Sequence, residues 1–438
     1  MGTSFLYLTK PCKTGNVDVR RTMRFVLLTL FAVGCLSCSR PTSTKISLRI
    51  ATWSGAGEDN EYYRLVQQIY RDFEAENPDI QIQVENMPSD YVAKMMLSHI
   101  AEVTPDVVVL DAASSALFMK NGVLQDISGF LAADKDLKRD QFFENTLLAG
   151  TYQNKLMSIP VDFTPMVMYY NKDLFDEAKV PYPVNGWSFQ EFEATAAKLT
   201  AGLATKHKKG FVLSTWMPGW VMWLWNNGGN VLDPSGTKAS GTLDSAANAE
   251  TISFLKGLVD KGYAPKLGEV AASGVDPFAN GDVAMNVSGH WSITGYKSAK
   301  GINWKRLGIV SMPTKLKSPV TVYYSSGLGI GNGCKNPEAA WRFIKHFCSY
   351  KNQLRYNSSG IAICARKDVA QERASEAIEN DFVQLVPGAR PPTGTQVEGY
   401  AFVEQQGKSM LEIVLNGRKK PADALREMAI RIDREFAK

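Results

Sequence analysis

The side chains that follow predicted strands are the residues of this chain best placed for binding chemistry. Trp53 follows a predicted strand over 46–50, and Asp111 follows the unbroken apolar run 107–110. In open α/β sheets ligands bind beyond the carboxyl ends of strands. Trp53 would offer an aromatic plane there, and Asp111 a carboxylate that accepts hydroxyl hydrogen bonds. Asp111 has a second interpretation, as the N-cap of a helix over 112–120.

A second group of candidate residues lies in the stretch 159–172, which reads IPVDFTPMVMYYNK. Pro160 and Pro165 each fix one φ angle and keep the preceding residue out of the helical region. We therefore predict a stiff segment in which the chain crosses from one lobe to another. Asp162 and Phe163 lie between the prolines and are placed to face a ligand, although Asp162 could instead steady the crossing.

Metal and cofactor chemistry is not indicated by the remaining reactive side chains. The four histidines are scattered, and Cys334, Cys348 and Cys364 form no C-x-x-C pair, so we expect neither a metal site nor a cofactor. The sequence is compatible with one disulfide among these cysteines and equally with three buried free thiols. Arg366 suits an acidic or phosphorylated ligand, but a surface salt bridge is the favoured interpretation.

The elements that must position these residues alternate between strand and helix. Strands are predicted over 46–50, 80–84 and 107–110, with helices over 62–77 and 90–101 between them, which is a doubly wound α/β pattern. Further helices are predicted over 188–199, 220–227, 244–261, 337–349 and 351–357 and in the tail, and further strands over 166–170, 283–287, 307–311 and 320–331.

Length and composition indicate a soluble protein of two domains. The chain has 438 residues, of which 45% are hydrophobic and 21% are charged. Its net charge is +5, but residues 1–34 hold five basic residues and one acidic residue and so supply +4 of it. The remainder is close to neutral and has no dense basic stripe, so nucleic acid is not expected as a partner.

The first 45 residues resemble the export signal of a bacterial lipoprotein. Three arginines precede the short apolar stretch 25–36, which ends in Gly-Cys-Leu-Ser-Cys at 34–38. We expect a signal peptide over 1–38, lipidation of Cys35 or Cys38, and a tether over 39–45. The protein would then be extracytoplasmic and anchored to the membrane by lipid. The sequence leaves open whether Met1 or Met23 is the true start.

Ten segments in order resemble the extracellular (periplasmic) solute-binding proteins, family 1, of bacterial ABC importers, of the carbohydrate-binding type. They are the Trp-bearing first strand, FEAENPDIQIQV, TPDVVVLDAAS, GVLQDIS, the crossing segment with YYNKDLF, WNNGGNVLD, FANGDVAMNVSGHW, LGIVSMPT, SSGLGIGNGCKNPEAAWRFIKHF and VLNGRKKPADALREM. The resemblance implies two α/β lobes with a ligand cleft between them, and both lobes discontinuous in sequence. Lobe one would be 45–162 with 314–360, and lobe two 163–313 with 361–438.

The resemblance also implies which aromatic residues face the ligand. Members that bind sugars keep aromatic residues at positions matching Trp53, Phe163, the turn from Trp216 to Trp220, Trp291 and Tyr324, the last of these with Ser326 in the YSSG run. Aromatic planes cover the apolar faces of sugar rings, while carboxylates and amides bind the hydroxyls. We expect Trp53 and Trp291 to stack on the ligand from opposite lobes. The sequence does not decide whether Trp216 and Trp220 belong to the site or to the core. Packing inside the protein is predicted for Trp223, Trp225, Trp304 and Trp341.

The implied function is capture of a small molecule, a mono- or oligosaccharide, and its delivery to an ABC transporter membrane permease by a monomeric protein without catalysis. A different ligand, such as a glycerophosphodiester, a polyamine or a metal chelate, is the first alternative. A glycoside hydrolase that uses Asp111 and Asp162 as paired carboxylates is the second. A surface adhesin is the third.

Overall fold

The computed structural model describes residues 45–53, 61–87, 90–111, 114–273, 276–360, 362–374, 377–392, 397 and 399–438. The chain divides into two units, 1–45 and 46–438, and every element below belongs to the second. The predicted signal peptide and most of the tether, with Cys35 and Cys38, lie outside the described residues.

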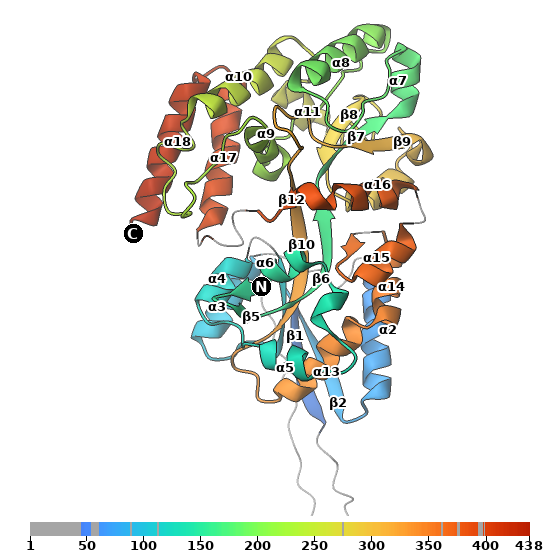
Figure 1. The fold of residues 1–438 in the computed structure, drawn as a ribbon, viewed down its shortest axis with the longest axis vertical. Coiled ribbons are helices and arrows are strands. Elements are labelled where there is room, and N and C mark those ends of the chain that lie inside the picture. Colours follow the sequence, from blue (N-terminus) through green and yellow to red (C-terminus); the bar gives the residue numbers. More distant parts are fainter. Residues whose placement is uncertain are drawn as a thin grey trace, which may run out of the picture. The chain divides into compact units, whose positions relative to one another are not determined.

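The first strands form the parallel part of a large sheet (Figure 1). β1 (Ile46–Thr52) pairs in parallel with β2 (Ile80–Asn86) and with β3 (Val107–Asp111). Helices α2 (Glu61–Glu76) and α3 (Tyr91–Ile100) connect these strands, as the alternating apolar pattern predicts. The doubly wound start of the chain is therefore confirmed.

The rest of the large sheet comes from distant parts of the chain. β10 (Thr321–Ile330) runs antiparallel to both β3 and β6 (Ile159–Pro165), and β11 (Ile363–Cys364) closes the order β11-β6-β10-β3-β1-β2. β12 (Ala389–Arg390) pairs with the start of β10. The sheet is thus mixed, and the segment predicted to be a stiff crossing is a strand whose seven residues are all buried.

A smaller sheet has the order β8 (Met285–Ser288)-β7 (Val167–Asn171)-β9 (Leu307–Val310). The chain enters it directly from β6 through Met166, whose N–H donates to the carbonyl of Val322 at 2.8 Å. It leaves between β9 and β10. The predicted lobe boundaries near 162, 313 and 360 fall inside β6, between β9 and β10, and just before β11, and the lobe assignment stays a prediction.

Helices and short strands complete the described residues. The helices are α4 (Ser115–Lys120), α5 (Ser128–Ala133), α6 (Glu144–Ala149), α7 (Lys172–Ala178), α8 (Phe189–Gly202), α9 (Val221–Asn226), α10 (Ala246–Asp260), α11 (Leu267–Ser273), α12 (Ser292–Ser298), α13 (Pro337–Phe347), α14 (Tyr350–Ser358), α15 (Lys367–Arg373), α16 (Ala377–Leu385), α17 (Tyr400–Leu415) and α18 (Pro421–Phe436). The 3-10 turns are η1 (Arg139–Gln141), η2 (Ala204–Lys206), η3 (Met217–Gly219), η4 (Trp304–Arg306) and η5 (Val386–Gly388), and β4 (Thr151–Tyr152) pairs with β5 (Lys155–Leu156).

Local sequence signals explain where the longer helices begin and end. α8 starts with a capping box, in which Ser188 Oγ accepts from the N–H of Glu191 and the Glu191 carboxylate accepts from the N–H of Ser188. α13 and α18 start with proline, whose missing N–H needs no partner in a first turn. Gly417 follows α17 at φ 69°, a conformation that glycine adopts without strain.

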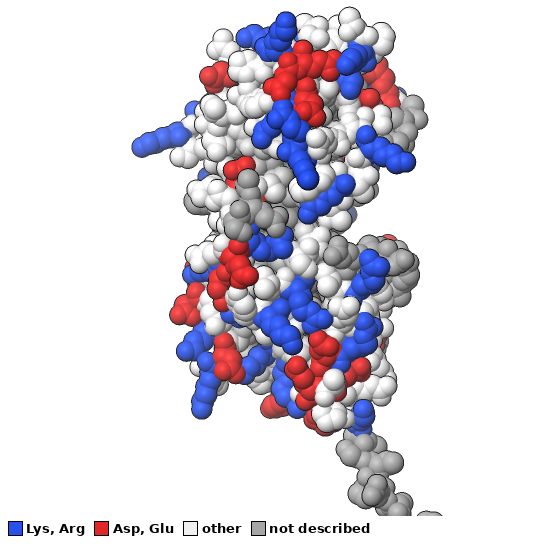
Figure 2. All heavy atoms as spheres, turned by 90° about the vertical axis from the view of Figure 1, so that its right-hand side faces the viewer, with Lys and Arg blue, Asp and Glu red and all other residues white. Residues whose placement is uncertain are grey.

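The buried hydrophobic residues form several clusters, and one of them, with Phe163, Tyr169 and Tyr323, contains residues of both sheets. One cluster packs on the small sheet and contains Trp223 and Trp225, and another packs on the large sheet and contains Trp341, so these three packing predictions are confirmed. Lys, Arg, Asp and Glu side chains alternate over the face of the molecule in Figure 2. None of the helices within the described ranges has the length and apolarity needed to cross a membrane.

Candidate functional site

Three aromatic rings that the sequence singled out lie against one another, and we call them the aromatic triad: Trp216, Trp291 and Tyr324. The Trp216 ring lies 6.0 Å from the Tyr324 ring, nearly parallel at 27°. Trp291 meets both rings edge-on, at 6.2 Å from Trp216 and 6.0 Å from Tyr324. Trp216 is 46% exposed, and the other two are half-buried. The triad therefore presents aromatic surface that the protein itself does not cover.

The turn that carries Trp216 separates it from Trp220. Trp216 precedes η3, and its N–H donates to Ser214 Oγ at 3.2 Å. Pro218 starts the 3-10 turn, after which Trp220 points into the core, has no exposed surface and donates its Nε1–H to the carbonyl of Thr215. The sequence did not decide whether Trp216 and Trp220 belong to the site or to the core. In the structure Trp216 is exposed and Trp220 lies in the core, so we leave Trp220 out of the proposed site.

Trp291 is held by the turn that follows β8. A Cβ atom on Gly289 would lie 2.4 Å from Cζ3 of the Trp291 ring and 2.6 Å from Cγ2 of Thr164 in β6. The indole therefore folds over a glycine that has no room for a side chain. The carbonyl of Gly289 also accepts a hydrogen bond from the buried hydroxyl of Tyr169 at 2.9 Å. These contacts fix the place of Trp291.

Tyr324 and Ser326 lie on the same face of β10, because alternate residues of a strand point the same way. Both are half-buried, whereas Tyr323 and Ser325 on the other face are buried. Ser326 is the register partner of Asp111 in β3 and of Asp162 in β6. One face of β10 therefore joins the aromatic triad to the carboxyl end of β3.

Asp111 and Trp53 line one wall of a cavity of about 500 Å³, together with Tyr91 of α3. The rings of Trp53 and Tyr91 meet edge-on at 5.4 Å. Asp111 Oδ1 accepts from the N–H of Ser114 at 2.7 Å, so the carboxylate does hold the approach to α4, although the N-cap residue of that helix is Ser114. Trp53 and Trp291 line different cavities, and their joint stacking on one ligand stays a prediction.

A larger cavity, of about 740 Å³, lies beside the triad. Its lining residues are Val212, Leu213, Ser214, Thr215, Trp216, Leu267, Gly268, Val270, Asp276, Pro277, Asn286, Val287, Ser288, Trp291, Glu412 and Asn416. The set combines two indoles with hydroxyl, amide and carboxylate groups. Thr215 Oγ1 donates to Glu412 Oε1 at 3.4 Å across this wall. A cavity of this size with a few polar groups among apolar ones is typical of a small-molecule site.

Glu404 is a site residue that sequence reasoning missed. Burial and the nearby charge of Asp111 raise the pKa of its carboxyl to about 7. Burial, followed by the charge of Glu404, raises the pKa of Tyr324 as well, so Glu404 lies within electrostatic reach of the triad. A signal was present: α17 buries Tyr400, Val403, Gly407 and Leu411, and Glu404 occupies the same face at helical spacing. A carboxyl group on the apolar face of a helix marks a functional candidate.

Asp162 lies in a closed polar cluster. Its Oδ1 accepts from the N–H of Ser326 at 3.0 Å, and its Oδ2 accepts from the hydroxyl of Tyr356 at 2.5 Å. The residue is buried, and burial raises the pKa of the carboxyl although both hydrogen bonds act in the opposite direction. These bonds join β6, β10 and α14, which matches the interpretation of Asp162 as a residue that steadies the crossing.

Phe163 has no exposed surface and packs in a core cluster. Its ring meets Phe143 at 5.3 Å and Tyr323 at 6.4 Å, both edge-on. β6 alternates its side chains between two faces that are both covered, so neither face is open to a ligand. We therefore leave Phe163 out of the proposed site.

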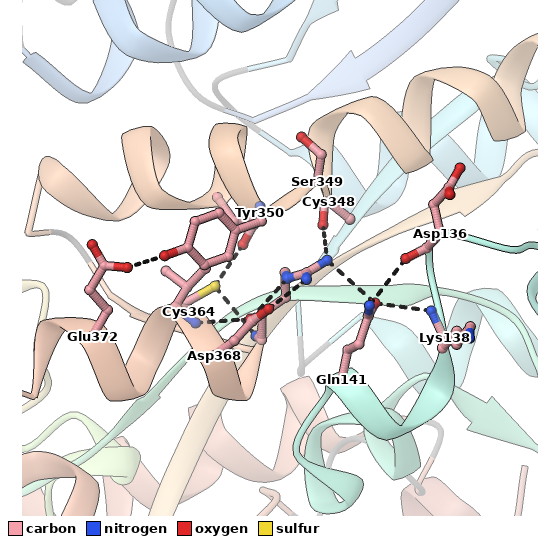
Figure 3. Close-up of polar contacts among 12 residues, drawn as sticks. Asp136, Lys138, Gln141, Cys348, Ser349, Tyr350, Cys364, Asp368 and Glu372 are labelled. Atoms are coloured by element: carbon pink, nitrogen blue, oxygen red, sulfur yellow. Dashed lines mark hydrogen bonds and ion pairs between the residues drawn. The ribbon is translucent and has the colours of Figure 1, made fainter.

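Arg366 is buried rather than exposed, which corrects the surface salt bridge favoured from the sequence. Its guanidinium forms two hydrogen bonds with Asp368, at 3.1 and 2.7 Å, and donates to the carbonyl of Cys348 at 3.1 Å. Figure 3 shows Asp368, Cys348, Cys364 and Gln141 gathered at this point. The guanidinium also approaches Gln141 Oε1 at 3.4 Å. The donors of Arg366 are used within the protein, so we leave it out of the proposed ligand site.

The three cysteines of the described unit are buried and carry free thiols. Cys364 Sγ donates to Gln353 Oε1 at 3.0 Å, and burial raises the pKa of Cys334 and of Cys348 to about 12. Within the described ranges no cluster of three His, Cys, Asp or Glu side chains has the spacing to hold a metal ion.

Comparison with known proteins gives the context of this site. Residues 68–382 match the family model described as bacterial extracellular solute-binding protein. The chain is 22% identical over 423 residues to the galactooligosaccharide-binding protein of Bacillus subtilis, covering 92% of this chain and 93% of that protein. It is also 22% identical over 423 residues to the maltodextrin-binding protein MdxE of the same organism, covering 91% and 96%.

A similar solved structure is an ABC substrate-binding protein of Listeria monocytogenes in complex with cycloalternan. It superimposes with a TM-score of 0.78 at 23% identity, over 90% of this chain and 99% of that one. The likeness confirms the two-lobe α/β fold expected from the sequence. Because the family model spans most of the chain, including β3, the crossing strands and both tryptophans of the triad, this protein belongs to the bacterial extracellular solute-binding proteins.

Proposed function

We propose that this chain binds an oligosaccharide at the aromatic triad and presents it to the membrane permease of an ABC importer. The observation that carries the proposal is the triad itself, in which two tryptophans and a tyrosine contact one another and remain partly open. Sugar rings stack on such surfaces through their C–H faces. The relatives named for galactooligosaccharide and maltodextrin binding support the same ligand class.

The polar residues around the triad would bind the hydroxyl groups. Ser288, Asn286 and Asp276 lie in the wall of the adjoining cavity, and Glu404 is an electrostatic neighbour of Tyr324. A carboxylate accepts hydroxyl hydrogen bonds more strongly than a neutral group does. The site thus offers apolar planes for ring faces and acceptors for their edges. The described residues that line the adjoining cavity include no arginine, which a phosphate ligand would favour.

The membership of the family places the protein outside the cytoplasm, and we propose that Cys35 or Cys38 anchors it there. The Gly-Cys-Leu-Ser-Cys run after a short apolar stretch supports this anchor. Mass spectrometry of the purified N-terminus should find acyl chains on one of these cysteines. We further propose that the protein acts as a monomer, which light scattering would test.

A second candidate function, glycoside hydrolysis, is favoured by one observation. Burial and the nearby charge of Asp111 raise the pKa of Glu404 to about 7, and a carboxyl group that keeps its proton near neutral pH can act as the general acid in the cleavage of a sugar bond. The pair first predicted for this role, Asp111 and Asp162, is less suited because both Asp162 oxygens accept protein hydrogen bonds. Binding without cleavage is our proposal, since the relatives are binding proteins.

A thermal-shift screen tests the proposed function. Maltotriose, galactooligosaccharides and cycloalternan should raise the Tm of the full chain, because a ligand that binds only the folded state stabilises it by mass action. Glycerophosphodiesters, spermidine and metal chelates form the comparison set. A shift with a member of this set alone would contradict the sugar proposal. Chromatography of the sugar after incubation should return it uncut, and cleaved products would favour the hydrolase instead.

A further inference from the structure

The turn that carries Trp291 also carries a buried histidine. His290 has no exposed surface, and its Nε2 lies 2.8 Å from Oε2 of Glu379, whose side chain is 6% exposed. Glu379 belongs to α16, 89 residues further along the chain. A buried acid–base pair removes two polar groups from water and is weak evidence for stability alone. Its position next to a proposed ligand contact therefore calls for a functional account.

α16 holds the imidazole from two sides. The ring of Phe382 lies 4.8 Å from the ring of His290, and Glu379 binds its edge. Burial alone would raise the pKa of the Glu379 carboxyl, but the hydrogen bond and charge of His290, with the charges of Arg373 and Lys297, lower it. The carboxylate of Glu379 is thus held inside the protein by His290, and one nitrogen of the imidazole, Nδ1, has no hydrogen-bond partner among the described residues.

The rest of the turn leaves Trp291 little freedom to move independently of His290. Ser288 Oγ and Ser292 Oγ lie 2.5 Å apart across the turn, and Tyr169 binds the carbonyl of Gly289. The Trp291 ring is seated directly over Gly289. A displacement of the backbone at 289–290 would therefore carry the indole with it, away from Trp216 and Tyr324.

We propose that His290 and Glu379 are positioning residues that fix the turn 288–292 and hold the Trp291 indole in the ligand site. The inference rests on the proposed function, because it assigns the ligand contact to Trp291 and the support of that contact to α16. Neither His290 nor Glu379 would touch the ligand. α16 thereby becomes part of the site through Glu379 and through the ring of Phe382, which packs on the imidazole.

The first test needs no ligand. Hydrogen exchange of the amides of 285–295 is measured in the full chain and in Glu379→Ala and Glu379→Gln. We expect at least about tenfold faster exchange in Glu379→Ala, because the buried imidazole loses its partner. The matched control is Glu76→Gln, which removes an exposed carboxylate 3.1 Å from His346 Nδ1 and should leave 285–295 unchanged. Unchanged exchange in Glu379→Ala would overturn the inference.

The second test uses pH to separate the charge of the Glu379 carboxylate from its capacity to accept a hydrogen bond. A lowered carboxyl pKa means that the stabilising contribution of Glu379 is present above the pKa of the unfolded chain and is lost only as pH falls through the lower folded value. Glu379→Gln keeps an acceptor for Nε2–H but carries no charge and does not titrate. We expect near-parental exchange of 285–295 in this variant at pH 7.5. Lowering the pH to about 3 should reduce the protection of 285–295 in the parent, as the carboxylate takes up its proton, and should have no such effect in Glu379→Gln.

The charged and titratable groups around the pair are Arg373, Lys297, Asp162 and Tyr169, and they are unchanged in both variants. Equal pH profiles for the parent and Glu379→Gln would overturn the role of the carboxylate. The control Glu76→Gln should follow the parent at both pH values.

The third test links the turn to binding, with maltotriose and a galactooligosaccharide mixture as probes. Whichever probe binds the parent should bind Glu379→Ala about tenfold more weakly, with Glu379→Gln close to the parent at pH 7.5. Parental affinity in Glu379→Ala, together with weak binding by Trp291→Ala, would overturn the positioning role. Parental affinity in Trp291→Ala would instead refute the proposed ligand contact, and the exchange measurement would still decide whether the pair fixes the turn.

Discussion

Two neighbouring tyrosines of β10 lie in opposite surroundings. Tyr323 is fully buried beside Phe163, and its hydroxyl donates to the carbonyl of Asn145 at 2.6 Å. Tyr324 is half-buried, lies against Trp216 and Trp291, and has Glu404 and Asp111 as electrostatic neighbours. One strand therefore carries a closed cluster on one face and an open one on the other.

Both regions contain aromatic and acidic residues, so composition does not separate structure from function here. In the closed cluster Phe163 is covered, and Asp162 beside it in β6 has both oxygens bound by protein donors. In the open cluster the aromatic faces are partly exposed, and burial raises the pKa of Glu404 to about 7. A ligand can stack on the exposed aromatic surface and can hydrogen-bond to the partly buried carboxyl group beside it.

The largest effect is expected from a substitution in the closed cluster. Phe163→Ala should lower the free energy of unfolding by about 3–5 kcal/mol, because it leaves a cavity between Phe143 and Tyr323. Denaturant unfolding measures the loss. Affinity for sugar, measured well below the melting transition, should stay within about threefold of the parent. A stable variant that no longer binds would show that Phe163 belongs to the ligand site after all.

The next effect concerns the open cluster. Trp291→Ala should weaken oligosaccharide binding by at least about thirtyfold, which corresponds to ~2 kcal/mol, because a desolvated aromatic contact is lost. Calorimetric titration gives the affinity, and the Tm without ligand should change little. Trp223→Ala is the control, since that ring is wholly buried. We expect the control to lose stability, and a similar collapse in Trp291→Ala would place Trp291 in the core.

A smaller effect should appear in the pH dependence that Glu404 confers. The folded protein keeps the proton of this carboxyl up to a pKa of about 7, above the ordinary value of 4.5, so its contribution disfavours the folded state increasingly as pH rises between these values. Ligand hydroxyls bind the ionised form better. Affinity should therefore rise roughly fivefold from pH 6 to pH 8 in the parent.

Glu404→Gln tests that dependence directly. The variant should bind with the same affinity at pH 6 and pH 8, because the amide does not titrate there. Glu412→Gln, which alters the neighbouring cavity wall on the same helix, serves as a matched control and should keep the parental slope. An unchanged slope in Glu404→Gln would exclude Glu404 as the titrating group.

The smallest effect is expected at Trp53. Its ring lies edge-on to Tyr91 in the cavity beyond Asp111, apart from the triad, so Trp53→Ala should cost ~1 kcal/mol of binding, roughly fivefold. Comparing maltose with a longer maltodextrin would sharpen the result. A larger loss for the longer sugar would place Trp53 at the end of an extended site, whereas equal losses would place it beside the triad.

Much of the fold was predictable because its elements follow local patterns. The strand 80–84 and the helix 244–261 differ from β2 and α10 by at most two residues at either end, since hydrophobic periodicity and capping residues set those bounds. The pairing of β10 between β3 and β6 was not readable from local patterns, because it joins residues about 160 to 220 positions apart and depends on packing rather than on neighbours.

The site was predictable only in part, for a physical reason. Trp216, Trp291 and Tyr324 were recognised as aromatic residues at turns and strand ends, but residue type could not show that Trp220 turns inward four positions later. The environment of Phe163 and Asp162 depends on β10, β11 and α14, which come much later in the chain. Glu404 was missed because its importance arises from burial next to Asp111 and Tyr324.

The central claim is that the exposed ring of the triad binds sugar, and one titration tests it most directly. Maltotriose, cycloalternan and galactooligosaccharides are titrated calorimetrically into the parent and into Trp216→Ala, with Trp341→Phe as a control from the core of the large sheet. We predict that at least one of these sugars binds the parent with one site per chain, binds Trp341→Phe equally well, and binds Trp216→Ala at least about thirtyfold more weakly. Equal affinity in the parent and Trp216→Ala, or no binding of any sugar to the parent, would contradict the account.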